Sequence, residues 1–280
     1  MKRGHVSEAP TDVVVDGPIT RHIRSVLAPN AGPMTLDGTN SLVMSGNGRS
    51  AVVVDPGPPD PSHLAALTSG PPVELILITH HHIDHTEASA ELSRLTGAPV
   101  RAFAENECHR GGAPLVDGEV IEVAGLQVRV VHTPGHSYDS VCFVVESDSD
   151  GEAAVLTGDT ILGRGTTVVY DLAAYLGTLE LLADLDGERE FVAVPAHGPV
   201  LPSLRGVAGM YLAHRQERLD QVRGVLAARE LDPAHLAADG PEESAVVDAV
   251  IAEHYQDIDP RNRFAAEKSV RSQLEYLRNR

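Results

Sequence analysis

The chain has 280 residues, of which 42% are hydrophobic, enough for one large core or for a large domain with a small one. Its 40 acidic and 22 basic residues give a net charge of −18, which argues against broad binding of polyanions but leaves room for a local basic groove. The first residues carry no apolar segment typical of a secretory signal, and no stretch approaches the roughly 18 apolar residues that suggest a membrane span. We therefore expect a cytoplasmic protein without a membrane partner.

Short runs rich in valine and isoleucine, bounded by glycine, proline or aspartate, predict strands through the first two thirds of the chain. These runs lie at residues 41–45, 51–55, 73–79, 126–133, 140–146, 153–159 and 191–197. Helical patterns lie at residues 61–69, 86–96 and 171–186. After residue 200 we expect a long helix over about 205–229, a connector over 230–243 and two more helices, which contain residues 246–251 and 264–277. Mixed strands followed by helices predict an α+β body with a small helical appendage.

The segment THHHIDH at 79–85 directly follows an apolar strand. His80 and His82 have the spacing that puts both side chains on one side of an extended chain. Asp84 and His85 come at the turn into the next helix. Nitrogen and carboxylate ligands of this kind suit zinc, and also manganese or iron. An exposed histidine-rich loop is the alternative, and the recurrence of ligand candidates at other strand ends argues against it.

Three further candidates close apolar strands, namely His136 in TPGHS, Asp159 in TGD and His197 in PAHG. Each has an ordinary alternative, as a surface or turn residue, when it is considered alone. Together they supply the ligands that a second metal needs, and their small neighbours let the backbone approach a crowded site. Two divalent cations roughly 3.5–4 Å apart can share a water and lower its pKa toward about 7. Asp84 would then orient the hydroxide or carry its proton.

This pattern, HxHxDH followed by a separated His, Asp and His, resembles that of the metallo-β-lactamase-fold hydrolases. The resemblance implies a four-layer αββα sandwich over residues 12–200 and a helical C-terminal region over 201–280, which is winged-helix-like from about residue 240. It assigns one metal to His80, His82 and His136, and the other to Asp84, His85 and His197, with Asp159 between them. Asp55 would support the ligands through hydrogen bonds, and His81 would point away from the metals.

Four further segments resemble the lactamase-beta-like 2 family, whose mammalian member is a mitochondrial endoribonuclease. They are NAGPMTLDGTN at 30–40, GDTILGRGTTVVYDLAAYL at 158–176, HGPV at 197–200 and YLAHRQERLDQ at 211–221. This resemblance implies cleavage of single-stranded RNA. The chain departs from the family at residues 137–140, and its end at Arg280 leaves little room for a β-hairpin wing. Basic helical segments at 205–229 and 258–280 would bind phosphates, with candidate substrate contacts at Tyr138, Arg261, Arg263 and Arg271.

Two other functions stay open at the level of sequence. A hydrolase of a small ester, thioester or lactam would use the same two metals, and the acidic net charge favours a small substrate over RNA. A non-catalytic binding module is the third alternative, and the complete set of ligands argues against it. No protein partner can be inferred from the sequence.

Overall fold

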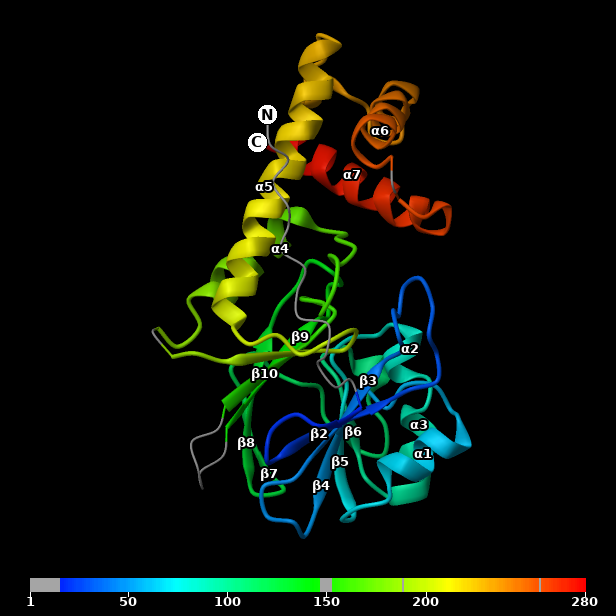
Figure 1. Ribbon diagram of the computed structural model, residues 1–280, viewed down its shortest axis with the longest axis vertical. Coiled ribbons are helices and arrows are strands. Elements are labelled where there is room, and N and C mark those ends of the chain that lie inside the picture. Colours follow the sequence, from blue (N-terminus) through cyan, green and yellow to red (C-terminus); the bar gives the residue numbers. More distant parts are fainter. Residues whose placement is uncertain (1–15, 147–152, 188, 257) are drawn as a thin grey trace.

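The computed structural model describes residues 16–146, 153–187, 189–256 and 258–280. Two sheets face each other and helices cover their outer faces, so the predicted α+β class with two sheets and helices is confirmed (Figure 1). A helical region extends from one end of this sandwich. Residues 12–15, with which the predicted catalytic domain begins, lie outside the described residues.

The first sheet holds six strands in chain order: β1 (Gly17–Pro18), β2 (Ile23–Leu27), β3 (Asn40–Met44), β4 (Ala51–Val54), β5 (Val73–Leu77) and β6 (Val100–Arg101). The pairings are antiparallel from β1 to β4 and parallel from β4 to β6. The outer face packs against α1 (Pro61–Leu67) and α3 (Ser89–Thr96) through Leu64, Leu67 and Leu92. Because β4 and β5 are parallel, the segments that follow them reach the same edge of the sheet.

The second sheet has the order β11 (Val192–Pro195), β10 (Ala153–Gly158), β9 (Val141–Glu146), β8 (Leu126–His132) and β7 (Val120–Val123). Its strands are antiparallel except for the parallel pair of β10 and β11. The helices α4 (Leu172–Ala183) and α5 (Leu204–Ala228) cover the outer face through a cluster that includes Tyr175, Leu179 and Val207. The parallel pair again brings two site segments, those after β10 and β11, to one edge.

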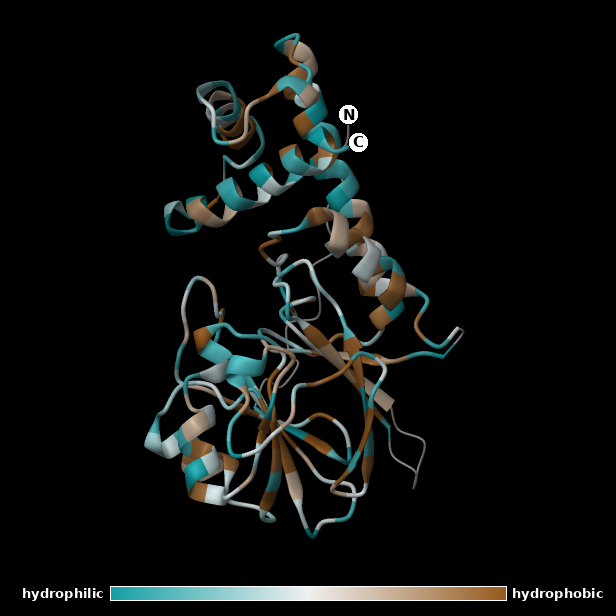
Figure 2. Ribbon diagram, turned by 180° about the vertical axis from the view of Figure 1, so that it is seen from behind, coloured by the Kyte–Doolittle hydropathy of each residue, from teal (hydrophilic) through white to brown (hydrophobic). Residues whose placement is uncertain are grey.

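The core between the sheets comes from alternating positions of the strands. Leu42 and Met44 of β3, like Val52 and Val54 of β4, point inward toward Val128 and its neighbours on the opposite sheet. Figure 2 shows that hydrophobic residues concentrate on these strands. Burial of each such side chain stabilises the fold by roughly 1.5–3 kcal/mol, so the sheets form a firm base for the loops at their edge.

The helical region has a core of its own. α5 runs for 25 residues, and its second half packs with α6 (Pro241–His254) and α7 (Arg263–Arg278) around a cluster that includes Val222, Val246 and Val270. Short 3-10 turns, η2 (Pro233–His235) and η3 (Pro260–Asn262), join these helices, and a third, η1 (Glu105–Glu107), lies in the sandwich. The first half of α5 packs on the second sheet, so this helix connects the two cores (Figure 1).

The structure corrects several predicted boundaries. The connector expected over 230–243 is shorter, because α6 begins at Pro241, a residue suited to the first helical position. The helix expected over 86–96 is two helices, α2 (Ile83–Thr86) and α3, so His85 lies within the first. The strands β1, β2, β6 and β7 were not predicted, and β1 and β6 have only two residues each. Over the described residues, no helix is long and apolar enough to cross a membrane.

Candidate metal centre and active site

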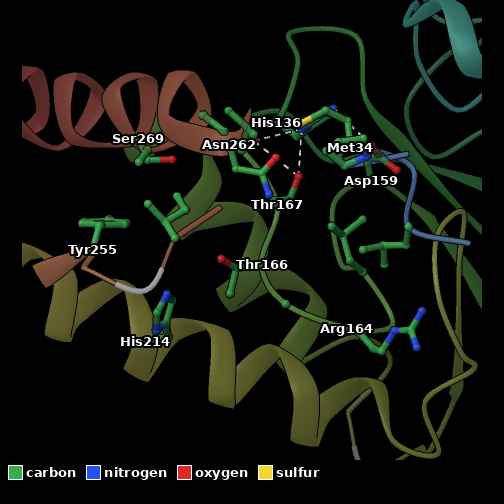
Figure 3. Close-up of a pocket in the computed structure, with 18 of the residues that line it drawn as sticks. Met34, His136, Asp159, Arg164, Thr166, Thr167, His214, Tyr255, Asn262 and Ser269 are labelled. Carbon is green, nitrogen blue, oxygen red and sulfur yellow. Dashed lines mark hydrogen bonds and ion pairs between the residues drawn. The ribbon is translucent and has the colours of Figure 1, made fainter. Parts of the chain in front are cut away.

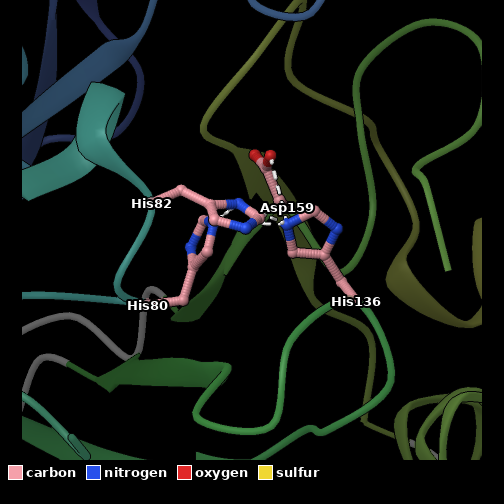
Figure 4. A group of neighbouring side chains, drawn as sticks. All are labelled: His80, His82, His136 and Asp159. Atoms are coloured by element: carbon pink, nitrogen blue, oxygen red, sulfur yellow. Dashed lines mark hydrogen bonds and ion pairs between the residues drawn. The ribbon is translucent and has the colours of Figure 1, made fainter. Parts of the chain in front are cut away.

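Three imidazoles and one carboxylate converge at the edge of the two sheets (Figure 4). His80 and His82 follow β5, and His136 follows β8. His80 Nε2 lies 3.0 Å from His82 Nδ1, and His136 Nε2 lies 3.2 Å and 3.1 Å from these two atoms. Nitrogen ligands placed about 2.0–2.1 Å from a tetrahedral metal are roughly 3.3 Å apart, so the spacing is close to that of a ligand shell.

A second group lies beside the first. The carboxylate atom Asp84 Oδ2 lies 3.1 Å from His197 Nε2 and 3.4 Å from His85 Nε2. Asp159 faces both groups, since its Oδ1 is 3.4 Å from His197 Nε2 and its Oδ2 is 3.7 Å from His136 Nε2. The structure therefore brings all seven predicted ligands together, in the two sets that the resemblance implies and with Asp159 between them.

Two observations test whether cations fit this site. First, His85 Nε2, His197 Nε2 and Asp159 Oδ1 are buried without any hydrogen-bond partner, which is costly for polar atoms unless something else binds them. Second, the site holds three carboxylates, those of Asp55, Asp84 and Asp159. Among the described residues, no lysine or arginine forms an ion pair with any of them. Unpaired donor atoms and uncompensated negative charge both fit two divalent cations.

Hydrogen bonds from the opposite ring nitrogens orient several ligands. His85 Nδ1 lies 2.9 Å from Asp55 Oδ2. His136 Nδ1 lies 2.9 Å from the carbonyl oxygen of Val168, and His197 Nδ1 lies 3.1 Å from the carbonyl oxygen of Gly38. Because these oxygens can only accept, Nδ1 carries the proton in each ring. Nε2 then presents a lone pair to the site, which is the tautomer that a metal ligand requires.

Asp55 connects the two sets of ligands. Besides His85, it accepts hydrogen bonds from the backbone N–H and the hydroxyl of Thr79, at 2.8 Å and 2.7 Å. The Thr79 hydroxyl lies 3.0 Å from His80 Nδ1, so one carboxylate orients a ligand of each set. Asp55 has a φ of 51°, a left-handed conformation that is uncommon outside glycine but that aspartate adopts more often than most residues. The role of Thr79 was missed in the sequence, although the residue stands directly before His80.

The pKa values of the histidines follow their surroundings. Burial, followed by the charges of neighbouring imidazoles, lowers the pKa of His80 well below its ordinary value and that of His82 to about 4. Burial alone would also lower the pKa of His85, but Asp55 and Asp159 outweigh it and raise that pKa well above the ordinary value. The first set thus favours neutral ligands, whereas the carboxylates around His85 attract a positive charge. A metal ion can provide that charge in place of a proton.

The motif at 30–40 positions the second set of ligands. Asn40 Nδ2 donates to the carbonyl oxygens of Pro195 and Gly198, on either side of His197. The Thr39 hydroxyl donates to the carbonyl oxygen of Asp84, at 3.1 Å. Thr39 and Asn40 therefore hold the backbone at Asp84 and around His197 in place, and these hydrogen bonds attach the loop to the metal centre.

The remaining predicted residues lie outside both ligand sets. His81 Nδ1 lies 2.7 Å from Asp139 Oδ1, so this ring is bound elsewhere, as expected. Tyr138 is 66% exposed, and its ring centroid is 5.4 Å from that of His81. The three candidate arginines of the helical region all form ion pairs with nearby acids: Arg261 with Asp259, Arg263 with Asp248 and Glu267, and Arg271 with Asp239 and Glu243.

The comparison with known families agrees with this geometry. The family model of the metallo-beta-lactamase superfamily matches residues 34–197, which is more than half of the chain and includes all seven ligands. The chain belongs to the metallo-beta-lactamase superfamily. This membership supports the predicted class, a metal-dependent hydrolase, and with the ligand sets it indicates divalent metal ions.

Several relatives within the superfamily are fungal proteins. Lactamase-like protein aptB of Emericella nidulans is 36% identical over 80% of this chain and 71% of its own length. An atrochrysone carboxyl ACP thioesterase of Aspergillus chevalieri is 36% identical over 75% of this chain and 66% of its own length. Among solved structures, a metallo-beta-lactamase family protein of Thermus thermophilus matches with a TM-score of 0.69 at 24% identity, covering 94% of this chain and 95% of its own. At that identity the match shows the shared fold alone.

Proposed function

We propose that this chain is a metal-dependent thioesterase that hydrolyses the thioester of a small organic acid. In the reaction, water attacks the thioester carbonyl, the C–S bond breaks, and the products are a carboxylic acid and a thiol. The convergence of seven ligand residues, with Asp159 between the two sets, carries the hydrolytic part of the proposal. The relatives named as ACP thioesterases support the choice of a thioester, which was the alternative to RNA cleavage in the sequence.

His80, His82 and His136 would hold one cation and Asp84, His85 and His197 the other, with Asp159 shared. Zinc suits this set of nitrogen and carboxylate ligands, and manganese and iron suit it as well. When bound, two such cations lower the pKa of a water toward about 7 and polarise the carbonyl oxygen.

Asp84 is placed to act on the attacking water. Its side chain is 23% exposed against 11% for Asp159 and 3% for Asp55, so it is the carboxylate of the site that solvent reaches best. The hydrogen bond of Thr39 to its backbone carbonyl fixes the turn from which it projects. In this position Asp84 orients the water and accepts its proton, which then passes to the leaving thiolate.

Cleavage of single-stranded RNA is the less favoured alternative. It rested on a resemblance to an endoribonuclease family and on arginines of the helical region. The relatives reported above are lactamase-like proteins and thioesterases, and Arg261, Arg263 and Arg271 already pair with acids. Counterion release on RNA binding would require these arginines to exchange their partners for phosphates.

A substrate panel tests the proposal. Metal-loaded protein is incubated with an acyl thioester of N-acetylcysteamine, a chromogenic lactam and labelled single-stranded RNA. We expect thioester hydrolysis, followed through the released thiol, to be fastest. His82→Ala should abolish it, and His235→Ala, which alters an exposed histidine of η2, should not. RNA cleavage without thioester hydrolysis would overturn the proposal.

A further inference from the structure

A cavity of about 250 Å³ opens from the metal centre toward the helical region (Figure 3). His136 and Asp159 line it at one end, so whatever occupies it reaches the ligands of the first metal. A cavity of this size accommodates a short acyl chain.

Apolar side chains from two loops line part of the cavity, beside the polar side chains of Thr166, Thr167 and Asn262. Met34 and Leu36 come from the loop before β3, and Leu162 and Val168 come from the loop between β10 and α4. The second loop is fixed at both ends, because Tyr211 of α5 accepts the N–H of Leu162 and Val168 accepts the Nδ1 proton of His136. Walls of this kind favour a hydrocarbon segment next to the metal centre.

The far end is polar and positively charged. His214 of α5 and Tyr255, which follows α6, lie there, as Figure 3 shows, and Arg218 of α5 lies over the Tyr255 ring. Arg215 of α5 lines the cavity closer to the metal centre, next to Thr167, whose hydroxyl lies 2.9 Å from His136 Nδ1. Arg215 is buried, and its Nη2 donates to the carbonyl oxygen of Thr167 at 2.8 Å, whereas its Nε is buried without a hydrogen-bond partner. Arg218 lies over the Tyr255 ring at 4.4 Å and is half-buried, which leaves its guanidinium within reach of a ligand.

Arg218 has donors to spare. Its hydrogen bonds to Gln221 Oε1 and to the carbonyl oxygen of His254 both use Nη1. No described residue accepts a hydrogen bond from its Nη2 or Nε, the pair of atoms that can bind both oxygens of a carboxylate. Other arginines of α5 differ, because Arg205 pairs with Glu190 and Arg223 pairs with Asp220.

The local charge around this cavity is unusual for the protein. Acidic residues outnumber basic ones by 40 to 22 in the whole chain. Within the described ranges, however, neither Arg215 nor Arg218 has a carboxylate partner within 4 Å. Their positive charge adds to burial in lowering the pKa of His214 to about 4, so this ring stays neutral near neutral pH. Two uncompensated guanidinium groups in a partly enclosed site favour an anionic ligand.

We propose that the cavity binds the acyl half of the thioester and that Arg218 binds a carboxylate at the far end of that acyl group. The substrate class is then a monothioester of a dicarboxylic acid, with its hydrocarbon segment between the two loops and its thioester carbonyl at the metal centre. Arg218 acts as a specificity residue, and Arg215 shapes the cavity through Thr167. This inference rests on the proposed thioesterase function and narrows its substrate.

A matched pair of substrates tests the inference. One is the N-acetylcysteamine monothioester of adipic acid, and the other is the same compound with its free carboxylate methylated. We expect the intact protein to favour the free acid by about tenfold to a hundredfold in kcat/KM, the usual effect of a charge-assisted bidentate contact. Arg218→Met should remove this preference, and Arg218→Lys should retain part of it. Arg223→Met, an exposed arginine of the same helix, should keep the preference of the parent.

The outcomes separate the two proposals. If the parent hydrolyses both compounds at equal rates, the inference fails and the thioesterase function stands. If it hydrolyses neither, both fail. If Arg218→Met slows both compounds equally and keeps their ratio, Arg218 only supports the packing of Tyr255, and the inference fails in that case as well.

Discussion

The sandwich and the helical region hold their functional residues in different ways. In the sandwich, His80, His85 and His197 are at most 1% exposed, and hydrogen bonds to a hydroxyl, a carboxylate and a backbone carbonyl oxygen, respectively, orient the three rings. In the helical region, His214 and Arg218 are half-buried and Arg218 has unused donors. Catalysis requires fixed ligand geometry, whereas recognition can use side chains that adapt to a ligand. The comparison suggests that chemistry resides in the sandwich and substrate selection at its junction with the helices.

The two regions also differ in what stabilises them. The sandwich has an apolar core between its sheets and further apolar layers under the helices on both sides. The helical region has a smaller apolar core and a buried acid, Glu243, which pairs with Arg271 and Arg278. Exposed pairs such as Arg263 with Asp248 contribute little by comparison. We therefore expect the helical region to open at a lower free energy than the sandwich.

The largest expected effect concerns the shared ligand. Asp159→Asn keeps the shape of the side chain but removes the charge that faces both ligand sets. We expect thioester hydrolysis to fall by about a thousandfold or more and the metal content to fall below two per chain, since both cations lose a ligand. Elemental analysis and thiol release measure the two effects. Asp220→Asn, an exposed acid on α5, is the control and should change neither. Two tightly held metals in the Asp159 variant would contradict the shared role.

The next effect tests how rigidly the sandwich fixes a ligand. Gly135 precedes His136 with a φ of 131°, and a Cβ there would lie 2.4 Å from the Cβ of Tyr175 in α4. We expect Gly135→Ala to lower the free energy of unfolding by about 3 kcal/mol, because it combines backbone strain with overpacking. Gly177→Ala is the control, since it lies in the same α4 with no atom within 4 Å of its Cβ. It should stabilise the protein by about 0.5–1 kcal/mol. Equal urea midpoints for the two variants would show that the turn at Gly135 tolerates a side chain.

A smaller effect should stay within the helical region. Glu243→Gln removes the negative charge with which both Arg271 and Arg278 pair. We expect it to lower the free energy of local opening of α6 and α7 by about 1–2 kcal/mol. Hydrogen exchange should then quicken in these helices and stay unchanged in β5. Glu242→Gln, an exposed neighbour in α6, should leave both rates as they are. Faster exchange in both regions would mean that they unfold together, which would contradict the expectation that the helical region opens at a lower free energy than the sandwich.

The sequence revealed the ligands because each one stands in a local pattern. His80 to His85 follow a buried strand, and His136, Asp159 and His197 each close one, so strand ends were sufficient to find them. The resemblance to the superfamily then predicted that two sheets pack face to face in a sandwich. The two-residue strands β1 and β6 have too few residues to show alternation, and their place depends on pairing with longer neighbours.

The cavity could not be found in this way. Its far end joins Arg218 of α5 to Tyr255 beyond α6, residues that only the packing of the helical region brings together. Arginines were noticed in this region, but Arg261, Arg263 and Arg271 proved to be paired with acids. The number of arginines is evident from the sequence, but which of them lack an acidic partner depends on the folded structure. Similarly, the carbonyl of Gly38 that orients His197 becomes relevant only once the fold is known.

The most direct test of the account is a metal titration of chelator-treated protein, followed by thioester hydrolysis. We expect no hydrolysis without metal and a rate that reaches its plateau at two zinc ions per chain. His82→Ala should remain inactive throughout the titration, because the first set then loses one of its three imidazoles. Full hydrolysis by the metal-free protein, or a normal plateau in the His82 variant, would contradict the central claim that these seven residues bind the catalytic metals.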